Sequence, residues 1–303
     1  MTELRRVAAT VVLVGLIGCA APPPPADPAH VAEVETWRRE RLEGLAADSG
    51  WLTLVGLHWL QPGPNRFGAA ADNQIVLAGD GLPDRAGELL VSDQGVVTLL
   101  PAPGVSLVVN GAEVTTGREL ATDAHGAPDV IGLGSLTLHL IERGDRVAVR
   151  VKDPHSAARR DFEGIDYFPV DSRFRVEGRF EPLPEPRPIT IVSVAGTEEE
   201  MLIPGTVRFE LGGAERSLLP IASSLDEKEL FFVFRDATSG RSTYGAGRFL
   251  VTDPPRDGRV VLDFNKAYNP PCAFTPYATC PLPPRENILG LAVTAGEKAP
   301  QGH

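Results

Sequence analysis

The 303-residue chain is long enough for two domains of ordinary size, each with its own hydrophobic core. Its 31 Gly and 28 Pro predict frequent turns, which favours strands over helices. The formal net charge of −11 repels nucleic-acid phosphates, and the sequence contains no compensating basic patch, so nucleic acid is excluded as a partner.

Residues 1–19 have the order of an export signal. Arg5 and Arg6 precede an apolar run from Val7 to Ile17, which is too short to cross a bilayer as a permanent helix. This order predicts a signal peptide.

The end of that signal, Leu16-Ile17-Gly18-Cys19, resembles the bacterial lipobox, in which cleavage precedes a cysteine that receives lipid. The resemblance implies a lipid on Cys19 and contact with the membrane through that lipid alone. Because Ala20 rather than Asp follows, it also implies the outer membrane, facing the periplasm, in a Gram-negative cell. A signal cleaved after Ala20 or Ala21 and an uncleaved anchor remain the alternatives.

Two short segments follow the signal. The Pro-rich residues 20–30 predict an extended tether, because consecutive prolines neither form a helix nor join a sheet. Residues 31–48 place apolar side chains at helical spacing among charged ones, so we expect the one substantial helix there, packed against a β core through Trp37.

Residues 51–153 are expected to form a β-sandwich lobe, since short apolar runs alternate with Gly, Pro and Asp clusters. Four motifs in order resemble a forkhead-associated domain. They are Arg66-Phe67-Gly68, Asn73-Gln74-Ile75-Val76-Leu77, Val109-Asn110-Gly111 and Gly144-Asp145.

The phosphopeptide site of that family does not carry over to this chain. The family binds phosphothreonine through an Arg after the glycine and through a Ser with a nearby His. Here Ala69 follows Gly68, and Pro83-Asp84-Arg85-Ala86-Gly87 stands where the Ser and His would lie. The resemblance therefore implies a shared strand plan without the binding function.

Residues 160–297 are expected to form a second β lobe. Apolar runs from residue 172 to 263, and again at 289–295, have connections short enough to require antiparallel neighbours, which predicts a meander closed as a barrel or a sandwich. The fold class is therefore mainly β, with one helix and two β lobes.

Long motifs in this second lobe resemble the bacterial and archaeal family called domain of unknown function 1684. They run from Phe232 to Leu250 and from Leu262 to Phe274, and end with Ala295-Gly296-Glu297. The family brings no assigned activity, so the resemblance implies where a site lies and not its chemistry.

Polar side chains are densest where these motifs meet a loop that is rich in proline. We predict that the end of the sheet and this loop form a pocket for a small polar or anionic ligand, in which an Arg grips the anionic group. The predicted ligand-binding residues are Tyr244, Arg248, Asp263, Asn265 and Asn269.

Two cysteines remain once Cys19 is lipidated. Cys272 and Cys280 form an even pair in an exported protein, which favours a disulfide across the loop. Free buried thiols are the alternative, and no metal or cofactor is expected because no His or second Cys pair stands near them.

Two other functions remain open. One is an envelope hydrolase with Asp263 or Asp236 as general base, or with His155 and Cys272 as a pair, although the usual hydrolase and nucleotide-binding motifs are missing. The other is a structural envelope protein. The sequence predicts neither the ligand nor the oligomeric state.

Overall fold

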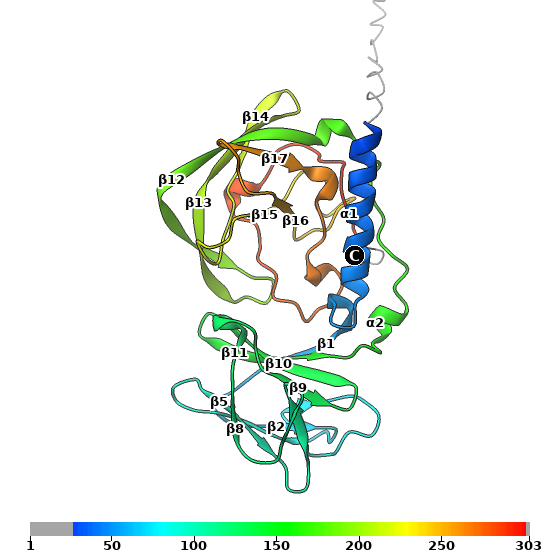
Figure 1. The fold of residues 1–303 in the computed structure, drawn as a ribbon, viewed down its shortest axis with the longest axis vertical. Helices are drawn as coiled ribbons and strands as arrows, with labels where there is room; N and C mark the ends of the chain where they lie inside the picture. The colour runs from blue at the N-terminus through cyan, green and yellow to red at the C-terminus, as the bar shows by residue number, and fades with distance from the viewer. Residues whose placement is uncertain (1–26, 301–303) are drawn as a thin grey trace, which may run out of the picture.

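The computed structural model describes residues 27–300 (Figure 1). The predicted signal, the predicted lipidation site Cys19 and most of the predicted tether lie outside the described residues. Within them the chain is mainly β with one long helix, so the predicted fold class is confirmed.

The long helix α1 (Pro28–Ala46) begins where the sequence has a start signal. Asp27 caps it by accepting a hydrogen bond from Ala29 N at 3.0 Å, and Pro28 fills the first turn, where a missing N–H is tolerated. Figure 1 shows α1 lying along one side of the C-terminal lobe. No helix among residues 27–300 combines the length and apolarity needed to cross a membrane.

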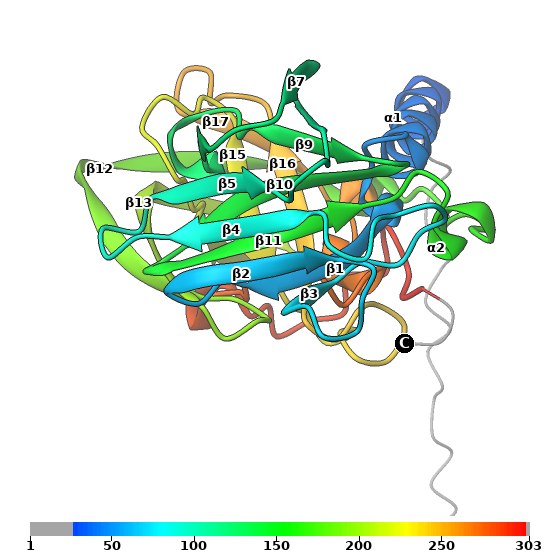
Figure 2. The same cartoon turned by 90° about the horizontal axis from the view of Figure 1, so that it is seen from below.

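The N-terminal lobe consists of two packed sheets, and the axes of their strands are roughly aligned in Figure 2. The first sheet has the order β1-β11-β10-β9-β6-β7 and the second β3-β2-β4-β5-β8. Their facing side chains form one core around Phe67, Leu99 and Leu138. The strands are β1 (Leu54–Trp59), β2 (Gly63–Gly68), β3 (Ile75–Val76), β4 (Gly87–Val91), β5 (Val97–Pro101), β6 (Leu107–Val109), β7 (Ala112–Val114), β8 (Arg118–Leu120), β9 (Val130–Leu133), β10 (Leu136–Arg143) and β11 (Arg146–Lys152).

The C-terminal lobe is a half-barrel of antiparallel strands with the order β14-β13-β12-β17, next to the pair β15-β16. The β12–β13 register shifts between Pro182 and Arg187, where three prolines interrupt the ladder. Phe232, Phe234 and Phe264 lie at the centre of the core. The strands are β12 (Arg175–Val192), β13 (Glu198–Leu211), β14 (Ala214–Leu218), β15 (Leu230–Phe234), β16 (Arg248–Thr252) and β17 (Arg259–Asp263).

Short helical turns connect these strands. Helix α2 (Ala157–Arg160) lies in the connector between the lobes, and 3-10 turns occupy much of the C-terminal loop region. These turns are η1 (Trp51–Thr53), η2 (Asp123–His125), η3 (Ser172–Phe174), η4 (Phe264–Lys266), η5 (Pro271–Ala273) and η6 (Arg285–Asn287).

The expected strand at 289–295 is wrong, because this segment is irregular. Its apolar residues Leu289, Val293 and Ala295 are buried, which explains the strand-like pattern in the sequence. Its backbone groups bond to those of Arg235 and Ala237, which follow β15, and to the side chains of Asp236 and Arg248.

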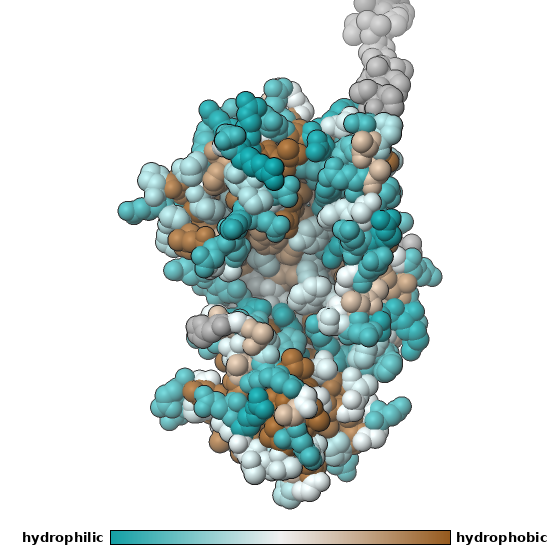
Figure 3. Space-filling view, viewed as in Figure 1, coloured by the Kyte–Doolittle hydropathy of each residue, from teal (hydrophilic) through white to brown (hydrophobic). Residues whose placement is uncertain are grey.

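On the outside, hydrophilic side chains cover most of the face seen in Figure 3, with apolar ones scattered among them.

Candidate functional site

A buried ion pair lies at the centre of the C-terminal motifs. Arg248 Nη2 is 2.9 Å from Asp236 Oδ2, and both side chains have no exposed surface. The guanidinium also donates to the carbonyl oxygens of Val293, at 3.0 Å, and Ala295. Burial lowers the pKa of Arg248, while the neighbouring Asp236 opposes that shift.

The second oxygen of Asp236 completes this network. Asp236 Oδ1 accepts hydrogen bonds from the backbone N–H groups of Thr238, at 2.8 Å, and Val293, at 3.1 Å. The pair therefore joins the β15–β16 connection to the irregular C-terminal segment. This arrangement favours a structural role for Arg248, because its guanidinium has no exposed surface.

Asp263 faces helix α1 instead of Arg248. Its Oδ2 lies 2.7 Å from His30 Nε2, and both side chains are 8% exposed. Its Oδ1 accepts from the backbone and side-chain N–H groups of Asn265, which holds the 3-10 turn after β17. The structure thus brings Asp263 and Asn265 together but directs the second carboxylate oxygen of Asp263 to His30 of α1.

The other three predicted ligand residues also make internal contacts. Asn265 pairs with the backbone N–H and carbonyl of Asp171, and Asn269 donates from its side chain to Lys298 O at 2.7 Å. Tyr244 donates from its hydroxyl to Cys272 O at 3.0 Å. None of the five predicted residues lines the two cavities considered below, and ligand binding by them stays a prediction.

The predicted disulfide is not formed, because Cys272 and Cys280 are both free thiols in the structure. The backbone N–H of Cys272 instead donates to Cys280 Sγ at 3.2 Å. The hydrogen bond between the two side chains, together with burial, raises the pKa of the Cys280 thiol. The alternative of free thiols therefore describes this structure, with Cys280 buried and Cys272 half-buried.

The expected Cys–His alternative is not assembled. His155 is exposed on the connector, where its backbone N–H donates to Asp153 Oδ1, and no contact joins it to Cys272 within the described part of the chain. Residues 27–300 also contain no group of three or more His, Cys, Asp or Glu side chains placed to hold a metal ion.

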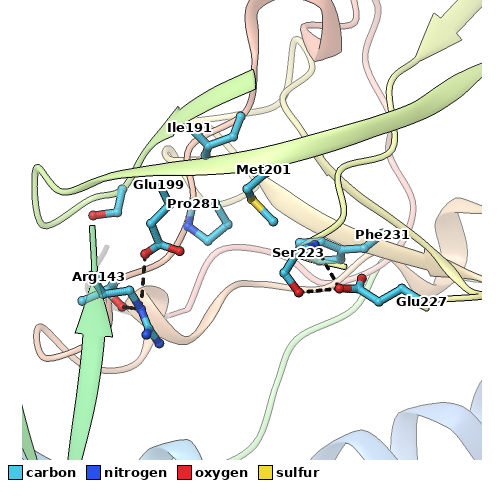
Figure 4. Close-up of a pocket in the computed structure, with 10 residues that line it drawn as sticks. Arg143, Ile191, Glu199, Met201, Ser223, Glu227, Phe231 and Pro281 are labelled. Carbon is cyan, nitrogen blue, oxygen red and sulfur yellow. Dashed lines mark hydrogen bonds and ion pairs between the residues drawn. The ribbon is translucent and has the colours of Figure 1, made fainter. Parts of the chain in front are cut away.

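A cavity of about 290 Å³ lies where the two lobes meet, and its lining residues come from both of them (Figure 4). Apolar side chains from β12, β13, β15 and the Pro-rich loop form much of its wall, and two carboxylates and one guanidinium lie around it. The lining residues are Arg143, Ile191, Ser193, Glu199, Met201, Ser223, Glu227, Phe231, Thr279 and Pro281.

The charged groups of this interlobe cavity are held in place by their neighbours. Arg143, at the end of β10, pairs with Asp123 at 3.0 Å and with Glu199 at 3.3 Å. Glu227 Oε1 accepts from the backbone N–H groups of Ser223 and Ser224, at 2.9 and 3.1 Å. Burial raises the pKa of Glu199, and Arg143 only partly offsets the shift.

A second guanidinium lies behind the cavity. Arg150 is 6% exposed, its Nη2 donates to Thr279 Oγ1 at 3.0 Å, and its Nε has no hydrogen-bond partner. Thr279 Oγ1 also accepts from Arg143 Nε at 3.3 Å, so one hydroxyl of the Pro-rich loop joins the loop to two strands of the N-terminal lobe. Burial lowers the pKa of Arg150 to about 10.

Sequence reasoning missed Arg143, Glu199 and Glu227. They lie in no common motif, and Arg143 meets the two carboxylates of the C-terminal lobe only because the lobes pack together. The signal that could have found Glu199 is its strand: Glu198, Glu199 and Glu200 open β13, and alternation requires the middle one to face opposite to the other two.

Comparisons with known proteins identify the C-terminal lobe. Residues 160–298 match the family described as protein of unknown function (DUF1684). The chain belongs to this family. A protein of Haloarcula marismortui, described as uncharacterised and solved by NMR, is 38% identical over 48% of this chain and 81% of its own, with a TM-score of 0.41.

A second solved structure gives a weaker match. A chain in the crystal structure of the FhaA FHA domain complexed with the intracellular domain of Rv3910 is 25% identical. The match covers 32% of this chain and 97% of that one, with a TM-score of 0.23. The comparison with curated proteins found no match.

Replacing Arg248 tests its structural role. Arg248→Ala should lower the free energy of unfolding by about 3–5 kcal/mol, because it leaves the Asp236 carboxylate buried without a cation. Chemical denaturation followed by circular dichroism measures the change. Arg235→Ala is the matched control, since Arg235 is exposed and should change stability by less than about 0.5 kcal/mol. An Arg248→Ala protein as stable as the wild type would contradict the assignment.

His139 lies near the cations Lys152 and Arg150, and its protonation can be tested by a change of pH. Burial, with Lys152 and Arg150, lowers its pKa from 6.5 to about 4. The folded state thus binds this proton more weakly than the unfolded state. The resulting stability is present above about pH 6.5 and is lost as the pH falls toward about 4. Thermal melts of His139→Gln should therefore show a smaller fall in Tm over that interval than the wild type. Equal falls would exclude this role, and His155→Gln, an exposed control, should behave as the wild type.

Proposed function

We propose that the protein is an exported lipoprotein of the cell envelope that binds a small polar ligand in the interlobe cavity. The order of residues 1–19 supports export and lipidation at Cys19. The pairing of an apolar wall with fixed polar groups in the interlobe cavity supports binding.

The volume and wall of the cavity carry the proposal. At about 290 Å³ it lies near the lower end of the range for small-molecule sites, which suits a compact ligand. Ile191, Met201 and Phe231 offer an apolar surface for the body of such a ligand. Glu199 and Glu227 lie on opposite sides of this surface in Figure 4 and provide acceptors for its polar groups.

The charge balance favours hydrogen-bond donors on the ligand over an anionic group. Among the lining residues two carboxylates face one guanidinium, and that guanidinium already pairs with Asp123 and Glu199. An added anion would meet Glu199 and Glu227 at short range, which is unfavourable in a partly buried site. A ligand that carries hydroxyl or ammonium groups would instead satisfy both carboxylates.

A binding screen tests this proposal. Polyols, small amines and small carboxylates are titrated into the wild type and followed by thermal shift and calorimetry. We expect an amine or polyol to bind, and Glu199→Gln to weaken its affinity about tenfold or more through loss of a charge-assisted hydrogen bond.

Glu200→Gln is the matched control for that experiment. It makes the same change of charge one residue along β13, on an exposed side chain facing away from the cavity, and should leave affinity unchanged. Equal loss in both variants, or no binding by any compound, would contradict the proposed site and favour a structural envelope protein.

Lipidation is tested separately. Cys19→Ser removes the proposed acceptor, so the variant should lose incorporation of an alkyne-labelled fatty acid and move from the membrane fraction to the soluble fraction of a bacterial host. Cys272→Ser is the control and should keep both properties. Labelling of Cys19→Ser at the wild-type level would contradict lipidation at this residue.

A further inference from the structure

Helix α1 is held on the C-terminal lobe mainly by polar groups. Of its 19 residues only four are buried, and two of these are His30 and Arg38. Besides the His30–Asp263 contact, Lys266 pairs with Glu33, and Arg38 donates to Phe168 O at 2.8 Å. The helix therefore contributes both Glu33, an anion, and Arg38, a cation, to a surface built by the rest of the chain.

Arg41 enters the most complete of these contacts. Its Nε donates to Glu297 Oε1 at 3.0 Å, and its Nη2 donates to the carbonyl oxygen of Asn269 at 2.9 Å. The guanidinium carbon lies 4.7 Å from the centre of the Tyr268 ring and 5.9 Å from that of Phe274. A carboxylate, a carbonyl and two aromatic rings thus surround one planar cation.

Residues outside α1 fix the position of the Glu297 carboxylate, which accepts from Arg41. The Glu297 side chain has no exposed surface, and its Oε2 accepts from Asn269 N at 2.7 Å. Burial raises the pKa of Glu297, and Arg41 counteracts the shift. A carboxylate buried in this way requires a cation, and a guanidinium satisfies it better than an ammonium because its N–H groups are spread in a plane.

One wall of the contact borders open space. Phe274 also lines a cavity of about 510 Å³ between the connector and the end of the chain. Ala273, Phe162 and Ala299 line the same cavity, and the rings of Phe162 and Phe274 pack edge to face, 6.3 Å apart. A small cation can approach the ring by this side.

We propose that Glu297, the Asn269 carbonyl, Tyr268 and Phe274 form a guanidinium-binding pocket, and that Arg41 is its internal ligand. The chemical class that the pocket recognises is an alkylguanidinium group, as carried by arginine. When the Arg41 side chain is absent, the pocket accepts such a group from solution. This site is separate from the interlobe cavity and does not depend on the function proposed for it.

Chemical rescue tests the pocket. In the full chain, Arg41→Ala should lower Tm by about 5 °C or more, because it leaves Glu297 without its cation. Ethylguanidinium at tens of millimolar should restore about half of this loss by binding to the folded protein, whereas ethylammonium should restore much less. The wild type and the exposed variant Arg39→Ala should show no gain with either compound.

The acceptor is tested in the same way. Arg41→Ala combined with Glu297→Gln should show no rescue, since the carboxylate that binds the cation is gone. Equal rescue by ethylammonium and ethylguanidinium, rescue that persists in the double variant, or no rescue of a folded Arg41→Ala would each overturn the proposal.

A measurement on the wild type covers the case in which Arg41→Ala does not fold. Arginine Nε–H signals are recorded by NMR, and that of Arg41 is assigned with Arg41→Lys, which keeps the charge. The Arg41 signal should exchange with water at least about tenfold more slowly than that of Arg39, because its Nε–H is hydrogen-bonded to a buried acceptor. Exchange at the rate of Arg39 would overturn the proposal.

Discussion

The C-terminal lobe depends on the contacts that the buried guanidinium of Arg248 makes. This guanidinium joins Asp236 to the carbonyls of Val293 and Ala295, and so fixes a segment that forms no regular ladder. The same segment ends at Glu297, whose carboxylate receives Arg41 of α1. One internal ion pair therefore sets the position of a second one, and through it the position of the helix.

Arginine side chains also hold the two lobes together. Arg143 and Arg150 leave the same face of the β10–β11 hairpin and converge on the hydroxyl of Thr279. These two long side chains hold the Pro-rich loop of the C-terminal lobe against the N-terminal lobe. The interlobe cavity lies beside this loop, which contributes Thr279 and Pro281 to its lining. Rigid prolines on either side of Thr279 keep that loop from collapsing into it.

Much of the fold could be read from the sequence, and less of the site. Periodicity and turn residues identified a mainly β chain with one helix, because burial on one face of each strand leaves a local pattern. The density of polar groups around Asp263, Asn265 and Asn269 was real, but most of their polar atoms bond to one another, the backbone and α1, and Asn269 Oδ1 has no partner. Composition cannot distinguish a polar network that faces a cavity from one that is closed on itself, since both need the same side chains. The meeting of Arg143 with Glu199 left no local signal because it depends on how the lobes pack, and Glu227 joins them from a loop distant in the chain.

The position of α1 relates these sites to the proposed membrane anchor. If Cys19 carries lipid, residues 20–27 separate it from the helix and can span at most about 28 Å when fully extended. The start of α1, and with it the C-terminal lobe, would then be held close to the headgroups. In Figure 1 the helix runs from that end toward the junction of the lobes, with the N-terminal lobe beyond it. Of the contacts that hold α1, salt would screen the partly exposed Lys266–Glu33 pair, whereas it would screen the buried Arg41–Glu297 pair much less. The buried pair would then keep α1 attached to the C-terminal lobe at the ionic strength of the membrane surface.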